Sequence, residues 1–377
     1  MKVIISAAGT GGHINPGIAI ANKIKEKQPK SEIIFIGTNR GLENDLVPRA
    51  GYKLKTIEAY GLKKEISFKN IKNIFKTLFS IKDAKKIIDE FKPDIVIGTG
   101  GYICGPVFSA AVSRKIPTVL HESNAYPGKA VKMFAKNVDK VLVGFPEAKN
   151  YLTSAKEVVV TGTPTKVRKI DINIKEKNKI KTTLGIKNDL PIVLIYGGSQ
   201  GAQKINEAIE GIIQRKINEK YQIIWATGPK QYDITKEKLE KLNMNINNLR
   251  NTKIVPYIYN MEEIMNIADL LICRSGAMTV NEVAVVGKPA IFIPLPSRAA
   301  NRQEDNALVL QKIGAAKMIL NNNLIFSNLA QEIDSIINKK SELEEMGRLA
   351  QTIAPSNVEE KIYEEIIKTI KKKYTCK

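Results

Sequence analysis

Two histidines occur in this 377-residue chain, and one of them, His13, lies within a run of glycines. An imidazole is half-neutral near physiological pH, so it can take a proton from a hydroxyl group. The surrounding stretch SAAGTGGHINPGIAIA reads as a strand end, a Gly-rich turn and a helix start, with Pro16 near the first helical turn. Such a turn points backbone N–H groups and a helix N-terminus at one place, which favours an anion such as phosphate. The stretch therefore predicts a phosphate site with His13 beside it, although a lone histidine is more often structural than catalytic. The other histidine, His121, ends an apolar strand and is expected to orient its loop.

Two further stretches repeat the order of strand, turn and helix. IVLIYGGSQGAQKIN carries Ser199 and Gln200 between glycines, and CRSGAMTVNE places Glu282 within the helix. A carboxylate there can accept two hydrogen bonds from a ribose diol, although Glu also suits a helix N-terminus for its dipole alone. Neither Gly-rich turn matches the dinucleotide fingerprint or the Walker loop. A single Gly-rich turn is often only structural, but one at the start of each half favours a ligand, because ligands of such sheets lie at the carboxyl ends of strands.

These turns are positioned by the elements around them. Along the chain, short apolar runs alternate with helical patterns, and this alternation is typical of parallel sheets covered by helices. The first series of expected strands comprises residues 2–6, 32–37, 94–98, 117–121, 140–143 and 157–161. The second series comprises residues 192–196, 222–226, 252–255, 270–273, 289–294 and 316–320. The pattern predicts an α/β protein with two doubly wound domains, residues 1–162 and 163–355. A closing helical pattern over 356–374 follows, within the segment 356–377.

Composition and charge limit the classes of partner. The chain carries 59 basic and 38 acidic residues, a net charge of +21. This charge favours an anionic partner, namely nucleic acid, anionic lipid or a phosphorylated ligand. The alternative is that it reflects only a Lys-rich, solvated surface. The sequence contains no recognised nucleic-acid reader motif, so no nucleic-acid partner is expected. No run of about 20 apolar residues could span a membrane, and the first residues read as a strand rather than a signal peptide. Cys104, Cys273 and Cys376 form neither a metal spacing nor an even disulfide set, in agreement with the cytosol.

The basic residues are dense in the segment 62–88, which has eight lysines and two acidic residues. At helical spacing Ile71, Ile74, Leu78, Ile81 and Ile88 share one face. A second strip beside that face comprises Phe68, Phe75 and Phe79 with Lys72, Lys82 and Lys86. Aromatic side chains that dip into a lipid interface among lysines predict a patch for an anionic membrane surface. The alternative is a wide core face with a solvated edge.

Six stretches follow one another between residues 9 and 307: GTGGHINPGIAIA, GTGGYICGPVFSAA, HESNAYPG, GGSQGAQKIN, CRSGAMTVNEVAVVGKPAIFIP and NRQEDNA. This ordered set resembles that of the MurG family, the membrane-associated N-acetylglucosaminyltransferases of peptidoglycan synthesis. The resemblance implies the GT-B fold, in which two Rossmann-like domains face a cleft and the last helix returns to the first domain. It implies inverting transfer of GlcNAc from UDP-GlcNAc to the C4 hydroxyl of MurNAc-(pentapeptide)-diphosphoryl-undecaprenol (lipid I), which forms lipid II. It also implies a peripheral place on the cytoplasmic face of the cell membrane, with other cell-wall synthesis and division proteins as further partners.

The resemblance assigns roles to single residues, with His13 as the catalytic base. The implied donor-binding residues are Thr10, Gly11, Gly12, Asn124, Lys166, Ser199, Gln200, Ile258, Ala277, Met278, Thr279, Glu282, Gln303 and Asn306. Of these, Ser199 and Gln200 suit the UDP phosphates, the backbone of Ile258 suits uracil, and Glu282 suits the ribose diol. The implied residues for the acceptor diphosphate are Gly9, Gly11, Gly12, Gly100, Gly101 and Tyr102. No Asp-x-Asp motif is present, so backbone dipoles and hydroxyls must meet the leaving-group charge, and we expect neither a metal nor a cofactor.

The chain departs from the family pattern at three places. Lys166 stands where the family usually has arginine, which keeps the charge but loses the bidentate fork. Ser123 replaces a common glutamine, and Val131 replaces a frequent asparagine. A UDP-GlcNAc 2-epimerase or a diacylglycerol glycosyltransferase would explain the donor half but not HESNAYPG. A nucleic-acid-binding protein would explain only the charge.

Overall fold

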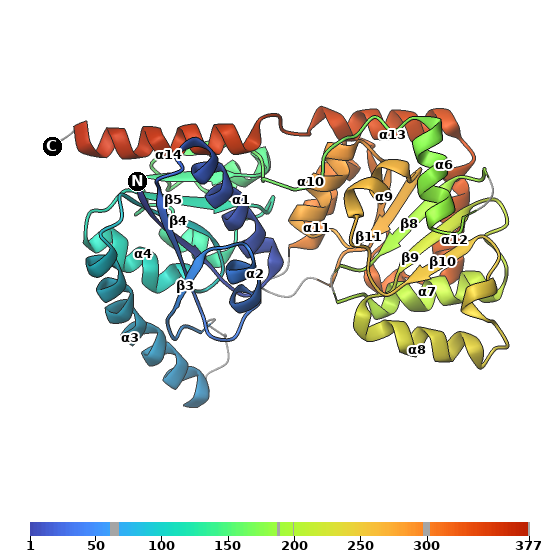
Figure 1. The fold of residues 1–377 in the computed structure, drawn as a ribbon, viewed down its shortest axis with the longest axis horizontal. Coiled ribbons are helices and arrows are strands. Elements are labelled where there is room, and N and C mark those ends of the chain that lie inside the picture. Colours follow the sequence, from blue (N-terminus) through green and yellow to red (C-terminus); the bar gives the residue numbers. More distant parts are fainter. Residues whose placement is uncertain (61–67, 187–188, 199, 297–301, 376–377) are drawn as a thin grey trace. The chain divides into compact units, whose positions relative to one another are not determined.

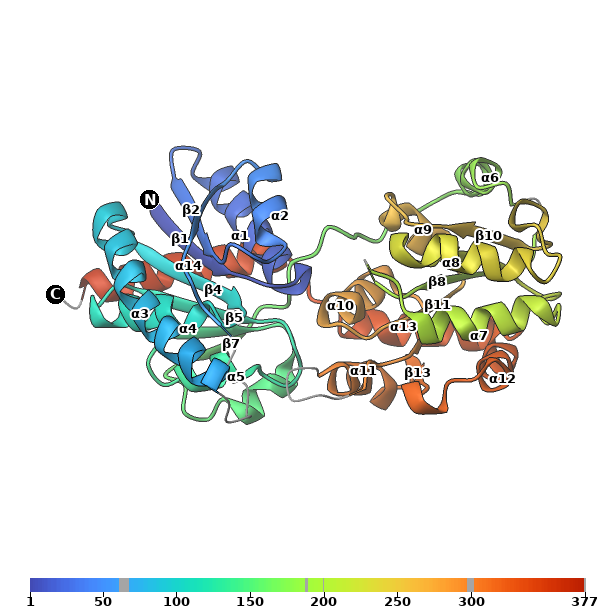
Figure 2. The same ribbon diagram turned by 90° about the horizontal axis from the view of Figure 1, so that it is seen from below.

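The structure is a computed structural model that describes residues 1–60, 68–186, 189–198, 200–296 and 302–375. The chain divides into two compact units. The first unit is Met1–Thr165 together with Pro355–Lys377, and the second unit is Lys166–Ala354. Each unit is built on its own parallel sheet (Figures 1 and 2).

The first unit holds a seven-stranded parallel sheet in the order β3-β2-β1-β4-β5-β6-β7. Its strands are β1 (Lys2–Ala7), β2 (Glu32–Gly37), β3 (Lys53–Thr56), β4 (Ile95–Gly100), β5 (Thr118–Glu122), β6 (Lys140–Val143) and β7 (Val158–Val160). Its helices are α1 (Gly11–Lys27), α2 (Glu43–Arg49), α3 (Phe68–Phe91), α4 (Cys104–Ser113), α5 (Lys129–Phe134), η1 (Pro146–Tyr151) and α14 (Val358–Thr375). The strand order reverses between β1 and β4, and ligands of open α/β sheets bind at the carboxyl ends of strands at such a reversal.

Helices cover both faces of this sheet, and a separate apolar cluster fills each face. On one face α1 buries Ile14, Ile18 and Ala21, which recur at helical spacing. Helix α14 lies beside α1 on that face and adds Ile362 and Ile366 to the same cluster (Figure 1). The last helix is therefore part of the first unit, although more than 300 residues separate it from α1 in the sequence.

The second unit holds a six-stranded parallel sheet in the order β10-β9-β8-β11-β12-β13. Its strands are β8 (Ile192–Tyr196), β9 (Gln222–Ala226), β10 (Thr252–Val255), β11 (Leu270–Cys273), β12 (Ala290–Phe292) and β13 (Ala316–Met318). Its helices are α6 (Ile174–Thr183), α7 (Gln203–Gln214), α8 (Pro229–Glu240), η2 (Ile246–Asn248), α9 (Met261–Ile267), α10 (Ala277–Val286), α11 (Gln303–Lys312), η3 (Asn321–Asn323), α12 (Phe326–Ile337) and α13 (Lys340–Thr352). Here the order reverses between β8 and β11, the strands that lead into the two predicted turns.

The expected α/β class with two parallel sheets is confirmed, and each expected strand is present. One strand was missed, β3, an edge strand that pairs with β2 alone and reads Lys-Leu-Lys-Thr. An edge strand exposes most of its side chains, so it lacks the apolar run that marks the buried strands. Among the residues that the structure describes, no helix is both long and apolar enough to cross a membrane.

Candidate active site

The Gly-rich turn of the first unit joins β1 to α1 at the strand-order reversal. Gly9 has a φ of +97°, a conformation that glycine adopts without strain, and Thr10 is the N-cap residue of α1. Within the described part of the chain no side chain caps this helix, and its first turn contains no acidic residue. The amides of Gly11 and Gly12 have no partner within the helix, because the first N–H groups of a helix lack an acceptor one turn earlier. This N-terminus is therefore suited to an anion.

His13 lies in that first turn, and Thr99, near the end of β4, forms hydrogen bonds with both its side chain and its backbone. The Nδ1–H of His13 donates to the Thr99 carbonyl at 3.2 Å, and the Thr99 hydroxyl donates to the His13 carbonyl at 2.7 Å. Since a carbonyl can only accept, Nδ1 carries the proton and Nε2 carries the lone pair. Gly100, with a φ of +119°, packs against the imidazole ring, where any Cβ would clash. The ring is thus fixed as the tautomer that a general base requires.

The electrostatics of His13 favour the neutral form. Burial lowers the pKa of His13 below its ordinary value, against the smaller opposing effects of Glu122 and the Thr99 carbonyl. The imidazole is therefore unprotonated at neutral pH. If it takes a proton, the Glu122 carboxylate stabilises the imidazolium that forms.

Glu122 is a residue of this candidate site that the sequence analysis did not single out. It is buried at the end of β5, where its Oε1 accepts from the amide and side chain of Asn124 at 2.9 and 2.8 Å, and its Oε2 from the Gly128 amide at 2.6 Å. Glu122 ends β5, the neighbour of β4 in the parallel sheet, and this neighbour relation belongs to the folded sheet and is not marked by any local spacing in the sequence. Asn124, predicted on the donor side, is partly buried and lies against this carboxylate.

The other acceptor-side residues gather at the same end of the sheet. Gly101 has a φ of +88°, and a Cβ there would lie 2.7 Å from the Ala8 carbonyl, so the turns after β1 and β4 touch. Tyr102 packs against the apolar cluster beneath α4. The Gly9 amide, however, is used within the protein, since it donates to the Glu43 carboxylate at 2.9 Å. The Gly9 amide is therefore taken by Glu43, whereas the amides of Gly11 and Gly12 at the start of α1 remain suited to an anion.

In the second unit the Gly-rich turn after β8 is equally constrained. Gly198 and Gly201 have φ values of +90° and +76°, and a Cβ at Gly201 would clash with the Thr227 carbonyl that follows β9. Asn206 of α7 ties these parts together: its Nδ2 donates to the Thr227 carbonyl at 3.0 Å, and its Oδ1 accepts from the indole of Trp225 at 3.0 Å. Gln200 is exposed on this turn, whereas Ser199 lies outside the described residues.

The third turn, after β11, is joined to the start of α11. The Ser275 hydroxyl donates to the Gln303 carbonyl at 2.7 Å, and Nδ2 of the buried Asn306 donates to the Ser275 carbonyl at 3.3 Å. The Gln303 side chain accepts from the Leu295 amide at 3.0 Å. Gly276 is the N-cap of α10, whose first turn contains Ala277, Met278 and Thr279.

Glu282 and Ile258 lie near these turns. Burial, with contributions from Cys273 and Glu282, raises the pKa of Tyr196 at the end of β8, so Glu282 lies close to the strand that leads into the Gly-rich turn. Ile258 is buried in the loop after β10, between Tyr257 and the highly exposed Tyr259, whose rings pack edge to face at 5.0 Å. Lys166, at the start of the unit, has an exposed side chain.

The predicted membrane patch falls on α3 and is described in part. Ala84 and Ile88 face the core, which agrees with the expected apolar stripe at its C-terminal end. Phe79 is 62% exposed, with the Lys82 ammonium 5.7 Å from its ring centre, and Lys86 is exposed. The side chains of Phe68, Lys72 and Phe75 lie outside the described residues.

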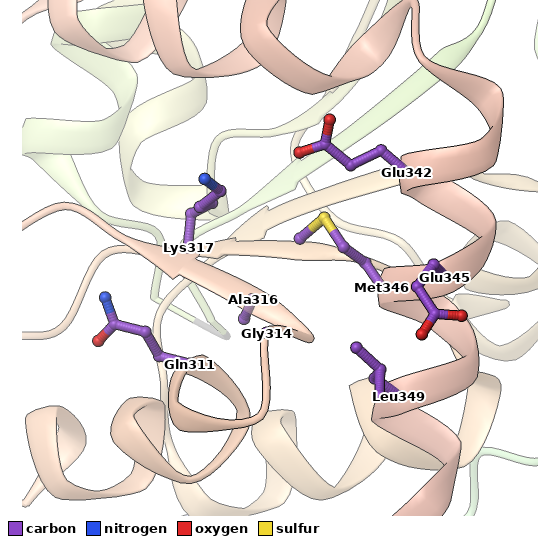
Figure 3. Close-up of a pocket in the computed structure, with 8 residues that line it drawn as sticks. All are labelled: Gln311, Gly314, Ala316, Lys317, Glu342, Glu345, Met346 and Leu349. Carbon is purple, nitrogen blue, oxygen red and sulfur yellow. The ribbon is translucent and has the colours of Figure 1, made fainter.

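A hollow of about 340 Å³ lies elsewhere in the second unit, between α11, β13 and α13 (Figure 3). Its lining consists of Gln311, Gly314, Ala316, Lys317, Glu342, Glu345, Met346 and Leu349. None of these is a motif residue. The candidate site therefore rests on the turns at the strand ends and not on this hollow.

Comparisons with known proteins agree with the motif reading. The glycosyltransferase family 28 N-terminal domain matches residues 3–143, and the glycosyltransferase family 28 C-terminal domain matches residues 192–363. A protein of Acetivibrio thermocellus named UDP-N-acetylglucosamine--N-acetylmuramyl-(pentapeptide) pyrophosphoryl-undecaprenol N-acetylglucosamine transferase is 44% identical and covers 99% of each chain. A relative of the same name from Caldanaerobacter subterraneus is 41% identical, over 98% of this chain and 100% of its own.

Solved structures give the same result at the level of the fold. The crystal structure of Acinetobacter baumannii MurG has a TM-score of 0.77 at 29% identity and covers 97% of this chain and 99% of its own. A UDP-GlcNAc 2-epimerase from Neisseria meningitidis has a TM-score of 0.65 at 16% identity, over 98% of this chain and 100% of its own. The second likeness shows a shared fold alone, and the expected GT-B fold is confirmed.

Proposed function

Because the chain belongs to the MurG family of glycosyltransferases, we propose that it transfers GlcNAc from UDP-GlcNAc to the C4 hydroxyl of lipid I and so forms lipid II. Transfer with inversion takes a single in-line displacement. It needs a base at the attacking hydroxyl and donors for the charge of the departing diphosphate. The observation that carries the proposal is the state of His13, a fixed neutral imidazole whose Nε2 has the lone pair, one turn into an uncapped helix.

On the acceptor side, His13 Nε2 takes the proton of the C4 hydroxyl as the new bond to the sugar forms. Glu122 stabilises the imidazolium while the proton is held. The amides of Gly11 and Gly12, with the Gly100 to Tyr102 turn, bind the acceptor diphosphate, and Thr10 lies beside them. These groups come from turns that glycine packing holds rigid, which is what efficient proton transfer requires.

On the donor side, UDP-GlcNAc is held by the turns after β8 and β11. The backbone of Gln200 and Ser199 and the N-terminus of α10 at Ala277, Met278 and Thr279 meet the negative charge that develops on UDP. Glu282 accepts from the ribose diol, and the Ile258 backbone pairs with uracil. Gln303, Asn306 and Asn124 serve the GlcNAc hydroxyls. Gln303 and Asn306 also hold the turn at Ser275 in place, since the Ser275 hydroxyl donates to the Gln303 carbonyl and the Asn306 side chain donates to the Ser275 carbonyl. Lys166 adds a single positive charge for the diphosphate.

The acceptor carries a polyprenyl chain, so the enzyme must work at a membrane surface. We place it peripherally on the cytoplasmic face of the cell membrane, in contact with anionic lipid through the exposed face of α3. Phe79, Lys82 and Lys86 support this placement, since an exposed aromatic ring among lysines suits a lipid interface. Other cell-wall synthesis and division proteins are further partners in this proposal.

The test uses the purified full chain, UDP-GlcNAc labelled in the sugar and a short-chain lipid I analogue, with EDTA present. We expect acceptor-dependent formation of a β-linked disaccharide lipid and stoichiometric UDP. Reactions without acceptor control for donor hydrolysis, and analysis of the sugar for ManNAc controls for epimerisation. If the donor is hydrolysed or epimerised and no disaccharide lipid forms, the acceptor assignment is wrong and only a UDP-sugar enzyme of this fold remains.

A further inference from the structure

A buried carboxylate lies behind the Gly-rich turn of the first unit. Glu43 is the first residue of α2 and has no exposed surface. Its Oε2 accepts from the Gly9 amide at 2.9 Å. Its Oε1 accepts from the Thr38 amide at 3.0 Å and the Thr38 hydroxyl at 2.7 Å. Three donors from two separate turns therefore converge on one side chain.

The surrounding backbone is shaped to admit this side chain. A Cβ at Gly37 would lie 2.7 Å from the Glu43 Cγ, and a Cβ at Gly41 would clash with the carboxylate itself. Burial acts to raise the pKa of Glu43, but the hydrogen bonds outweigh it and the pKa is lowered. The group is thus an anion at neutral pH, and hydrogen bonds from backbone amides to an ionised carboxylate are about twice as strong as neutral ones.

We infer that Glu43 is a positioning residue for acceptor binding and transfer: by holding the Gly9 amide it fixes the turn from which Gly11, Gly12 and His13 project. The inference rests on the proposed function. Gly9 has a positive φ and no side chain, so few other contacts hold it. The negative charge behind the turn also opposes an anion at Gly9. It therefore directs the acceptor diphosphate to the amides of Gly11 and Gly12.

Two variants separate positioning from general stability. In Glu43→Gln one carboxylate oxygen becomes an amino group, so the side chain can no longer accept from both Gly9 and Thr38. In Thr38→Val the carboxylate loses one hydroxyl donor, but its hydrogen bond with Gly9 stays. Both changes disturb the same buried group, and only the first weakens the hold on the turn. Asp45→Asn, on the exposed face of α2, controls for a charge change nearby.

Three measurements are made on each full-length variant: kcat and KM for the lipid I analogue, UDP affinity, and amide hydrogen exchange of the peptide spanning residues 6–14. For Glu43→Gln we expect kcat/KM for the acceptor to fall about tenfold or more, with UDP affinity within about twofold of the parent. Exchange of the 6–14 peptide should be faster. Thr38→Val and Asp45→Asn should keep kcat/KM within about twofold and leave that exchange unchanged.

The inference is overturned if Glu43→Gln and Thr38→Val lose activity equally, or if Glu43→Gln leaves exchange of the 6–14 peptide at the parental rate. Loss of UDP affinity in proportion to activity would likewise indicate general unfolding and refute it. An active parent chain with these results refutes the positioning role alone. An inactive parent chain refutes the proposed function and this inference with it.

Discussion

At the scale of single residues, the chemistry depends on which nitrogen of His13 holds the proton. Thr99 settles this, because its carbonyl takes the Nδ1–H and leaves the Nε2 lone pair for substrate. Burial then keeps the ring neutral, and Glu122 limits how far the pKa falls. In the proposed mechanism the Thr99 carbonyl and the Glu122 carboxylate together orient the His13 imidazole and stabilise its charged form, as one aspartate does in a catalytic triad.

A pH profile tests this arrangement. Because the pKa of His13 is lowered, the base is neutral above its pKa and is lost as pH falls through it, so kcat/KM for the acceptor should decline only below about pH 6.5. Glu122→Gln removes the charge that opposes the shift, so the acid limb of its profile should move to lower pH. An acid limb of the parental kcat/KM profile that lies above pH 7 would contradict this account, and so would an acid limb that moves to higher pH in Glu122→Gln.

The second histidine predicts a pH effect on stability. His121 is fully buried with its Nε2–H bonded to the Gly162 carbonyl at 3.0 Å, and burial lowers its pKa to about 4. The unfolded chain binds a proton near pH 6.5 and the folded chain does not, so the free energy of unfolding should fall as pH drops from 6.5 to 4, by roughly 3 kcal/mol from this group. Denaturant titrations across that range measure the slope. In His121→Gln the slope should flatten, and an unchanged slope would contradict the assignment.

At the scale of elements, glycines set the shape of each turn at the end of a strand. Gly201 is the sharpest case, because its φ is positive and a Cβ would clash with the Thr227 carbonyl. The turn after β8 therefore keeps its shape only with glycine at this position. Asn206 and Trp225 hold the facing backbone and make that shape rigid.

Gly201→Ala should weaken UDP binding by about tenfold and lower the free energy of unfolding by about 1–3 kcal/mol, since the turn must move to admit the methyl group. Calorimetric titration with UDP and denaturant unfolding measure the two effects. Gly185→Ala is the matched control: its φ of +73° is equally unfavourable, but a Cβ there has open space among the described residues. It should cost only about 1 kcal/mol and leave UDP affinity unchanged. Equal UDP affinities for the two variants would contradict a binding role for the turn.

The sequence predicted the elements better than the contacts between them. Buried parallel strands are continuous apolar runs, so nearly all appear in the pattern, and only the Lys-rich edge strand β3 does not. The Gly-rich turns were found because strand, glycine and helix signals are local. Glu43 and Glu122 were missed because their roles depend on backbone amides and a ring up to about 110 residues away, which no local spacing reveals. The use of the Gly9 amide within the protein could not be foreseen for the same reason.

At the scale of the whole molecule, the two units divide the work of one transfer. In the proposed reaction the first unit supplies the base His13 and the Gly-rich turn that binds the acceptor diphosphate, and the second unit supplies the turns that bind UDP. The net charge of +21 gives the chain a general attraction to anionic surfaces, and α3 adds an exposed aromatic ring to that attraction. Charge alone attracts the protein to any anion, so the aromatic contribution must be tested separately.

The contribution of the exposed aromatic ring is tested by measuring binding to vesicles of phosphatidylglycerol and phosphatidylcholine. Phe79→Ser should weaken binding by about threefold to tenfold, and Lys82→Glu should do so by a similar factor that shrinks at high salt. Ile174→Ser, at an 81% exposed apolar residue of α6, is the control and should bind as the parent does. Sedimentation with the vesicles gives the affinities. If all three variants bind equally, the face of α3 is not the membrane contact.

The most direct test of the central claim compares the parent chain with His13→Ala in the transfer of labelled GlcNAc to the lipid I analogue, with UDP affinity measured on the same preparations. We predict a loss of kcat by a factor of about 10² to 10⁴ in the variant, with UDP affinity within about twofold of the parent. The reason is that the proposed mechanism has His13 act on the bound acceptor and assigns the UDP contacts to turns of the other unit. Transfer at the parental rate by His13→Ala, with UDP bound normally, would show that another group takes the proton.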